Sequence, residues 1–111
     1  MHFSQPRPLS PADPVSAFSS GKPELDEWLS RRALKAEGRS ARTYVVNTSD
    51  AAIAGYFCLS ASNIELSAAP PNLARNMPKQ IPVILLGRLA VASRFQGMGL
   101  GKNMLQDAMV R

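Results

Sequence analysis

The chain has 111 residues, of which 45% are hydrophobic, so it buries a modest core and forms one domain or part of one. Thirteen Lys and Arg against eight Asp and Glu give a net charge of +5, which favours polyanions and acidic surfaces as partners. One cysteine, Cys58, and one histidine, His2, exclude an intrachain disulfide and a cysteine metal cluster and argue against a zinc site or a histidine-based triad.

Residues 1–23 are rich in proline and serine, which predicts extended, loop-like backbone with at most a short strand or turn. This stretch has no apolar segment of the kind that a signal peptide requires, and the longest apolar runs of the chain are too short to cross a bilayer. We therefore expect a cytoplasmic protein that makes no use of a membrane.

A helix is predicted to begin at Pro23 and to end before Gly38. Proline suits the first helical position, and acidic residues follow it at the positive end of the helix. Leu25, Trp28 and Leu29 fall on one face at helical spacing, so core packing is the expected role of Trp28. The alternative for Trp28 is stacking on a terminal base.

Two antiparallel strands are predicted at 43–46 and 53–60, because both are rich in strand-forming residues and the turn-forming segment NTSD lies between them. Residues 61–82 are marked by prolines, which predicts a long excursion or a short helix rather than another strand. Residues 83–91 predict a strand buried on both faces, with a bulge or a close backbone approach at Gly87.

From residue 100 the pattern becomes helical, with Leu100, Met104, Leu105 and Ala108 on one side. The sequence reaches Arg111 with neither a glycine cap nor a closing strand. We therefore expect a chain that stops early. Its apolar sheet edge is expected to promote segment swapping, dimerisation or aggregation unless another segment covers it.

The segment RFQGMGLGK (residues 94–102) joins the apolar strand to this helix. A dinucleotide-binding G-x-G-x-x-G would place glycine where Lys102 stands. A P-loop would need glycine in place of Gln96 and Ser or Thr in place of Asn103. The spacing that fits is Q-x-x-G-x-G.

Backbone amides at a helix N-terminus are unpaired and lie at the positive end of the dipole, so a diphosphate can bind there where side chains are absent. Gly97, Gly99 and Gly101 permit that approach, while the amides of Met98, Leu100 and Lys102 are expected to donate. The Lys102 ammonium adds charge. A turn that needs glycine for its conformation alone is the alternative, and the order of strand, loop and helix favours the anion site.

This strand, ending LGRLAV, with its loop and helix resembles motif A of the GNAT acetyltransferases. The resemblance implies acetyl-CoA as co-substrate, its diphosphate on the loop and its pantetheine arm along the strand. An amide of that strand would also stabilise the oxyanion of acyl transfer. The implied cofactor-binding residues are Leu89, Ala90, Val91, Gln96, Gly97, Met98, Gly99, Leu100, Gly101 and Lys102.

Segments along nearly the whole chain are similar to the GNAT toxins of bacterial type II toxin–antitoxin systems. These segments are FSSGKPELDEWLSRRAL, YFCLS, RNMPKQIPVILLGRLAV and QGMGLGKNMLQDA. The similarity implies a toxin that acetylates the amino group of aminoacyl-tRNA and blocks translation, acts as a homodimer and is neutralised by a ribbon-helix-helix antitoxin. It also implies one incomplete GNAT domain over 1–111, an α/β fold whose mostly antiparallel, mixed sheet has flanking helices and lacks its C-terminal strands.

Family members continue into a helix whose tyrosine protonates the CoA thiolate. The tyrosines of this chain, Tyr44 and Tyr56, lie in predicted strands and match no such position, so no catalytic acid is assigned and the chain is expected to be inactive by itself. It is either a piece of a longer protein, which we favour, or a natural truncation. An α-amine is partly neutral near pH 7, so it can attack the thioester without a strong base. Acetyl transfer through Cys58 is the rival to this direct attack, and buried packing is the favoured role of that thiol.

A basic run, Arg31, Arg32, Lys35, Arg39 and Arg42, suits the phosphates of a tRNA acceptor arm or forms a solvated face, and both interpretations stay open. Arg88 in a predicted buried strand needs an acidic partner or an anionic ligand.

The sequence is compatible with three functions. They are an aminoacyl-tRNA acetyltransferase, a GNAT enzyme of a protein or small-molecule amine, and a non-catalytic remnant that binds antitoxin, toxin or RNA.

Overall fold

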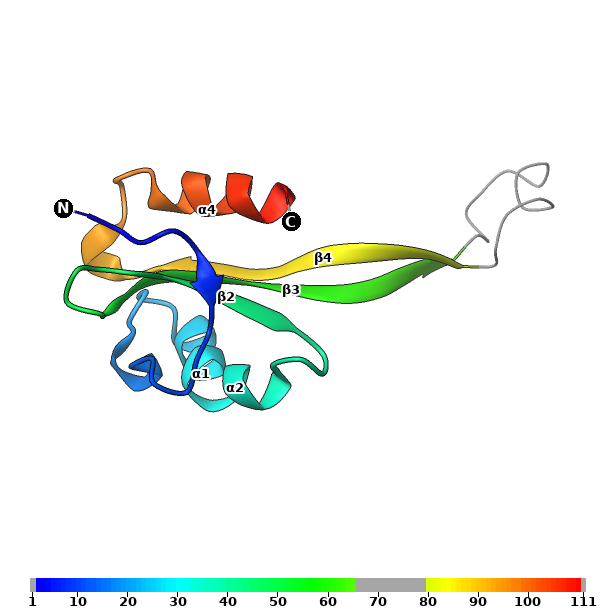
Figure 1. Ribbon diagram of the computed structural model, residues 1–111, viewed down its shortest axis with the longest axis horizontal. Coiled ribbons are helices and arrows are strands. Elements are labelled where there is room, and N and C mark those ends of the chain that lie inside the picture. Colours follow the sequence, from blue (N-terminus) through cyan, green and yellow to red (C-terminus); the bar gives the residue numbers. More distant parts are fainter. Residues whose placement is uncertain (1, 66–79, 111) are drawn as a thin grey trace.

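The computed structural model describes residues 2–65 and 80–110, which form an antiparallel four-stranded sheet in the order β1-β2-β3-β4 (Figure 1). The strands are β1 (Arg7–Pro8), β2 (Arg42–Asn47), β3 (Ile53–Glu65) and β4 (Gln80–Val91). The helices are α1 (Pro23–Arg31), α2 (Ala33–Ala36) and α4 (Leu100–Met109), with 3-10 turns η1 (Val15–Ala17) and η3 (Ser93–Phe95). Within the described residues, every helix is too short or too polar to span a membrane.

Helices lie on both faces of the sheet, with α1 and α2 on one face and α4 on the other (Figure 1). Tyr56 of β3 is fully buried, and its hydroxyl donates a hydrogen bond to the Leu25 carbonyl of α1 at 2.7 Å. Met104 of α4 is buried against the other face of the same strand, where Gly55 lies. The α/β class and the flanking helices are thus confirmed.

The helix predicted from Pro23 to Gly38 is interrupted. Arg32 has φ −122° and separates α1 from α2, and Ala33 directly after the break is fully buried. The start at Pro23 is confirmed, and Gly38, at φ +77°, follows the second helix in the left-handed conformation that favours glycine.

The hairpin of β2 and β3 is confirmed, with a short strand β1 added at the edge of the sheet. The prediction for residues 61–82 is wrong at both ends, because β3 runs to Glu65 and β4 begins at Gln80. Long antiparallel pairing outweighs the effect of Pro82, which faces Asn63 in a strand at the edge of the described sheet. The rest of that prediction, including Pro70, Pro71 and Pro78, lies outside the described residues.

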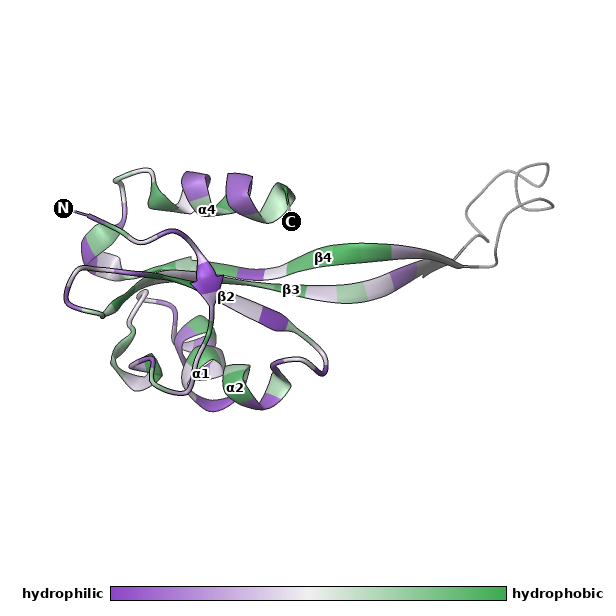
Figure 2. Cartoon of the chain, viewed as in Figure 1, coloured by the Kyte–Doolittle hydropathy of each residue, from purple (hydrophilic) through white to green (hydrophobic). Residues whose placement is uncertain are grey.

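The prediction that β4 is buried on both faces is also wrong over its first half. Ile84, Leu85 and Leu86 are 64%, 49% and 40% exposed, and Figure 2 shows this apolar stretch extending beyond the described helices. Burial is reached near the other end, where Ala90 is 5% exposed. The bulge at Gly87 is confirmed, because Cys58 faces Arg88 whereas the next residue of β3 faces Leu86.

Candidate functional site

The glycine loop between η3 and α4 is open to solvent. Gly97 and Gly99 both have φ +82°, and Gly99 is the N-cap residue of α4. A Cβ atom at either position would meet no atom within 4 Å. The loop therefore needs glycine for its backbone conformation, and these two positions leave its surface free of side chains.

The start of α4 presents unpaired donors. The Asn103 amide donates to the Gly99 carbonyl at 3.1 Å, while the amides of Gly97 through Lys102 have no acceptor among the described residues. The amides of Leu100, Gly101 and Lys102 belong to the first turn, so they point out of the positive end of the helix. This is the arrangement that the sequence predicted for binding an anion.

Side chains on the N-terminal side fix the loop in place. The Gln96 side-chain amide donates to the Ser20 carbonyl at 2.8 Å and to the Val91 carbonyl at 2.9 Å. Phe95 is 3% exposed and makes an edge-to-face contact with Phe3 at 5.3 Å between ring centroids. Gln96 was expected beside the coenzyme, and in the structure its side chain joins the loop to the protein.

Gly101 has a role different from the one expected. A Cβ at this position would lie 3.5 Å from Val91 Cγ2 and 3.8 Å from Leu89 Cδ2, so Gly101 faces β4 and not the open loop surface. Glycine here permits close packing of the first helical turn on the strand that precedes the loop. That packing fixes the distance between the helix N-terminus and the end of β4.

Within the described sheet, β4 is an edge strand, so one of its two sides faces no other strand. The Ala92 amide donates to the Ala54 carbonyl of the β3 side at 2.8 Å. Because backbone groups alternate along an antiparallel strand, Ala90 also faces β3, and the backbone groups of Leu89 and Val91 face the open edge. Of the three strand residues expected along a pantetheine arm, Leu89 and Val91 therefore present backbone groups to the open edge, whereas the backbone groups of Ala90 pair with β3.

On the opposite face of β4, Arg88 lies over the indole of Trp28, with 4.4 Å from its guanidinium carbon to the ring centroid. Trp28 also stacks with Tyr56 at 6.0 Å and packs against the core, which confirms the packing prediction. Among the described residues no carboxylate lies within ion-pair distance of Arg88. The described residues supply no acidic partner and the guanidinium contacts an aromatic ring, so the anionic ligand that the sequence also allowed stays a prediction.

The basic run is divided between two surface hollows. Arg31, Arg32 and Lys35 line a hollow of about 590 Å³ together with Trp28. Arg39 and Arg42 line a second hollow of about 450 Å³, whose walls also include Tyr44, Leu59 and Ile84. Both hollows combine cations with apolar or aromatic surface.

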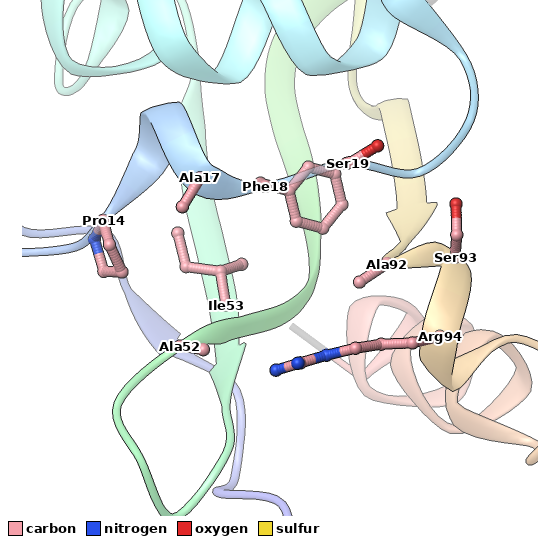
Figure 3. A pocket seen from close by; sticks show the side chains of 9 residues that line it. All are labelled: Pro14, Ala17, Phe18, Ser19, Ala52, Ile53, Ala92, Ser93 and Arg94. Carbon is pink, nitrogen blue, oxygen red and sulfur yellow. The ribbon is translucent and has the colours of Figure 1, made fainter.

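A further pocket near the loop was not anticipated from the sequence. It measures about 370 Å³, and its walls include Phe18, Ile53 and Ala92. Arg94 reaches across it toward Ala52 (Figure 3). Because its walls come from segments far apart in the chain, local sequence patterns carry no sign of it.

The side chains of Tyr56 and Cys58 are buried in the core, and that of Tyr44 packs against it. Burial raises the pKa of the Tyr56 hydroxyl well above its usual range, and that hydroxyl donates to the Leu25 carbonyl. Tyr44 is half-buried and stacks on Phe57 at 5.2 Å. Cys58 is 2% exposed, as its predicted packing role requires. In the described ranges, no group of three or more His, Cys, Asp and Glu side chains could hold a metal ion.

The chain is similar to a curated protein along nearly its whole length. It is 42% identical over 109 residues to the tRNA-acetylating toxin of Mycobacterium tuberculosis strain H37Rv, covering 98% of this chain and 66% of that protein. No family model matches the chain.

Solved structures share its fold. The structure of AtaTR bound with AcCoA has a TM-score of 0.79 at 30% identity, covering 96% of this chain and 66% of that one. AtaT complexed with acetyl-methionyl-tRNAfMet has a TM-score of 0.77 at 27% identity, covering 97% and 67%. AtaT Y144F bound to the C-terminus of the antitoxin AtaR and acetyl-CoA has a TM-score of 0.75 at 25% identity, covering 96% and 63%.

Sequence similarity over nearly the whole chain and the shared fold point to the same group of proteins. The chain therefore belongs to the GNAT-fold acetyltransferase toxins of bacterial toxin–antitoxin systems, the group that includes the tRNA-acetylating toxin of M. tuberculosis.

Proposed function

We propose that the protein containing this chain transfers the acetyl group of acetyl-CoA to the amino group of aminoacyl-tRNA and so blocks translation. The observation that carries the proposal is the open glycine loop at the start of α4. Gly97 and Gly99 leave its surface bare, and the amides from Gly97 through Lys102 have no acceptor in the described part of the chain. A diphosphate fits this cluster of donors, and the exposed Lys102 adds a positive charge.

The open edge of β4 would receive the rest of acetyl-CoA. The Leu89 carbonyl and the amides of Leu89 and Val91 face this edge and are suited to pair with a pantetheine arm, while the Val91 carbonyl already accepts from Gln96 Nε2. An edge amide close to the thioester would also stabilise the oxyanion that forms during acyl transfer. The AcCoA-bound relative supports this co-substrate.

The acceptor is an amine that needs little activation. A free α-amine has a pKa of about 7.7 to 8.0, so part of it is neutral at pH 7 and can attack the thioester carbon. The new N–C bond forms as the C–S bond breaks, the nitrogen loses a proton to solvent, and the thiolate leaves. Positioning of the two reactants supplies much of the acceleration.

We also propose tRNA and an antitoxin as the macromolecular partners. The cations of the two hollows, Arg31, Arg32, Lys35, Arg39 and Arg42, are suited to tRNA phosphates, and a relative was solved with acetyl-methionyl-tRNAfMet. An antitoxin is the expected inhibitor, since a relative binds the C-terminus of its antitoxin, and the resemblance to the toxin family makes a ribbon-helix-helix protein the expected type. A homodimer would cover the exposed apolar side chains Ile84, Leu85 and Leu86, and light scattering of the purified protein measures its oligomeric state.

The test of the coenzyme site is calorimetric titration of the chain with CoA. Gly99→Asp places a carboxylate among the proposed phosphate donors, and we expect its affinity to fall by at least about tenfold. Gly99 has φ +82°, so aspartate there also strains the loop backbone, and circular dichroism of the variant measures whether the helix is retained. The matched control is Gly38→Asp, because Gly38 also has positive φ and open space around it. Equal affinity of the Gly99→Asp variant and the parent would refute the site.

The acceptor is tested with radiolabelled acetyl-CoA and the protein that contains the chain. We expect transfer to aminoacyl-tRNA and none to free lysine or peptides. Transfer to the latter alone would favour the alternative of a protein or small-molecule acetyltransferase. Absence of transfer to any acceptor would leave a binding function.

A further inference from the structure

Arg88 is a fixed cation whose hydrogen-bond donors remain available. Its guanidinium carbon lies 4.4 Å from the centroid of the Trp28 ring, and the side chain is half-buried. No carboxylate of the described residues pairs with it. Stacking on an aromatic face restrains the planar guanidinium and leaves its N–H groups free, so the group is prepared to bind a phosphate through two parallel hydrogen bonds.

The position of Arg88 along β4 places it across the strand from the proposed coenzyme loop. The side chains of Leu89 and Val91 face α4, where Gly101 packs against them. Side chains alternate along a strand, so Arg88 points to the opposite face, and its contact with Trp28 of α1 confirms this. Figure 1 shows α1 and α4 on opposite faces of the sheet. Arg88 directly precedes Leu89, whose backbone faces the open edge.

Trp28 connects Arg88 to the other cations of this face. The same indole lines the hollow that contains Arg31, Arg32 and Lys35. In the described part of the chain, none of these cations forms an ion pair with a carboxylate. Several unpaired cations around one indole suit a chain of phosphates better than a single anion.

We propose that Arg88 binds a backbone phosphate near the 3′ end of the acceptor RNA, on the face of β4 opposite the acetyl-CoA loop. Through this contact Arg88 acts as a positioning residue that brings the aminoacyl amine to the open edge of β4. The inference rests on the proposed function, because it assumes that the amine is acetylated at this edge.

The test measures RNA binding and CoA binding separately. The RNA probe is a short hairpin with a single-stranded 3′ end that carries a stable 3′-aminoacylamino nucleoside. For Arg88→Gln we expect an affinity loss of about tenfold and a salt-dependence slope smaller by about 0.7. Arg94→Gln is the matched control, because Arg94 also lies over an aromatic ring, that of Phe95, at 4.8 Å. The control and the parent are expected to agree within about twofold, since Arg94 belongs to a different surface.

A second measurement asks whether the lost contact is a phosphate contact. Neutral methylphosphonates replace the last few linkages of the probe one at a time. We expect one replacement to weaken binding to the parent and to have no further effect on Arg88→Gln. Additive effects at every linkage, or unchanged RNA affinity of Arg88→Gln, would overturn the proposal. Polyglutamate serves as a model of an acidic protein partner. If Arg88→Gln weakened binding to polyglutamate but not to the RNA probe, Arg88 would be assigned to such a partner, and the proposal would be overturned.

Titration with CoA separates the two levels of inference. If Arg88→Gln bound both CoA and RNA as well as the parent does, the proposed role of Arg88 would be refuted and the proposed function would stand. Absent CoA binding by the parent would remove the proposed function whatever the RNA result. Arg88→Gln could also lose CoA affinity. In that case Arg88→Lys is measured, because lysine keeps the positive charge but lacks the planar guanidinium that forms two parallel hydrogen bonds. Recovery of both CoA affinity and the methylphosphonate effect in Arg88→Lys would support the proposal, and recovery of CoA affinity with no methylphosphonate effect at any linkage would count against it.

Discussion

Met104 of α4 packs directly against Gly55 of β3. A Cβ atom on Gly55 would lie 2.9 Å from Met104 Cε, 3.0 Å from Met104 Sδ and 3.0 Å from the Ala90 carbonyl oxygen. Met104 is 1% exposed, so its side chain has little room to move away. The missing side chain at position 55 therefore sets how closely α4, with the donors at its N-terminus, approaches the sheet.

The first prediction follows from this contact. Gly55→Ala is expected to lower the free energy of unfolding by about 1 to 3 kcal/mol, because the added methyl group overpacks the contact between α4 and β3. CoA affinity is expected to fall as well, since the helix that carries the amides must shift. Urea denaturation and calorimetric titration measure the two effects.

The control for Gly55→Ala is a double-mutant cycle with Met104→Ala, which removes the side chain that the new methyl group meets. We expect Gly55→Ala to cost less in the Met104→Ala background than in the parent. Equal costs in the two backgrounds would show that the methyl group does not meet Met104.

A buried hydroxyl gives the second prediction. Thr43 of β2 is 1% exposed, and its Oγ1 has no hydrogen-bond partner among the described residues. Thr43→Val removes this group at nearly constant shape and is expected to raise the free energy of unfolding by about 1 kcal/mol. Thr48→Val is the matched control, because Thr48 Oγ1 accepts a hydrogen bond from the Ala52 amide at 3.2 Å. Stability must fall in the control, and a fall in Thr43→Val as well would contradict the prediction.

The third prediction concerns the acid stability of the N-terminal segment. Burial alone would raise the pKa of the Asp13 carboxyl, but the hydrogen bond from the Ser10 amide and the adjacent Arg7 guanidinium outweigh it and lower that pKa below its usual value. A carboxyl group whose pKa is lower in the folded state stabilises the protein above its unfolded pKa of about 3.9. That contribution is lost as pH falls through the folded value.

Asp13→Asn tests this dependence. We expect it to lower the free energy of unfolding by about 1 to 3 kcal/mol at pH 7, with a smaller difference from the parent below about pH 4. The control is Asp50→Asn, at an exposed position between β2 and β3. It is expected to change the free energy of unfolding little both at pH 7 and below about pH 4. A difference between Asp13→Asn and the parent that stays constant down to pH 3 would contradict the assigned cause.

The local chemistry of the glycine loop could be predicted from the sequence because it depends on neighbours in the chain. Gly97 and Gly99 adopt positive φ, and α4 begins at the next residue, as the spacing indicated. The same holds for the bulge at Gly87 and for the burial of Cys58. Each of these features follows from residue type and spacing alone.

Features that depend on distant partners could not be predicted in this way. The lengths of β3 and β4 are set by their mutual pairing, which outweighs the proline signal at Pro82. The exposure of Ile84 follows from where the described helices end, which no pattern within the strand reveals. The contact between Arg88 and Trp28 joins residues far apart in the chain, so the sequence indicated an acidic partner or an anionic ligand and gave no sign of the indole.

Gln96 illustrates the same limit and gives the last prediction. The sequence placed it in the coenzyme motif, whereas its Nε2 donates to the carbonyls of Ser20 and Val91. Gln96→Glu keeps the shape of the side chain but replaces this donor with a carboxylate that faces two carbonyl oxygens. The loop should then detach from the N-terminal segment, and CoA affinity is expected to fall by at least about tenfold, because the amides lose their fixed arrangement.

The control for Gln96→Glu is Gln106→Glu, an exposed position on α4 that adds the same negative charge. Its CoA affinity is expected to stay within about threefold of the parent, since a solvated charge away from the loop is screened. Hydrogen exchange of the Ser93 and Phe95 amides, which donate to the Ser19 and Ala92 carbonyls beside the loop, separates the two causes. Faster exchange in Gln96→Glu than in Gln106→Glu would mean that Gln96 acts by holding the loop. Equal exchange with a specific loss of affinity would mean instead that Gln96 contacts the coenzyme itself.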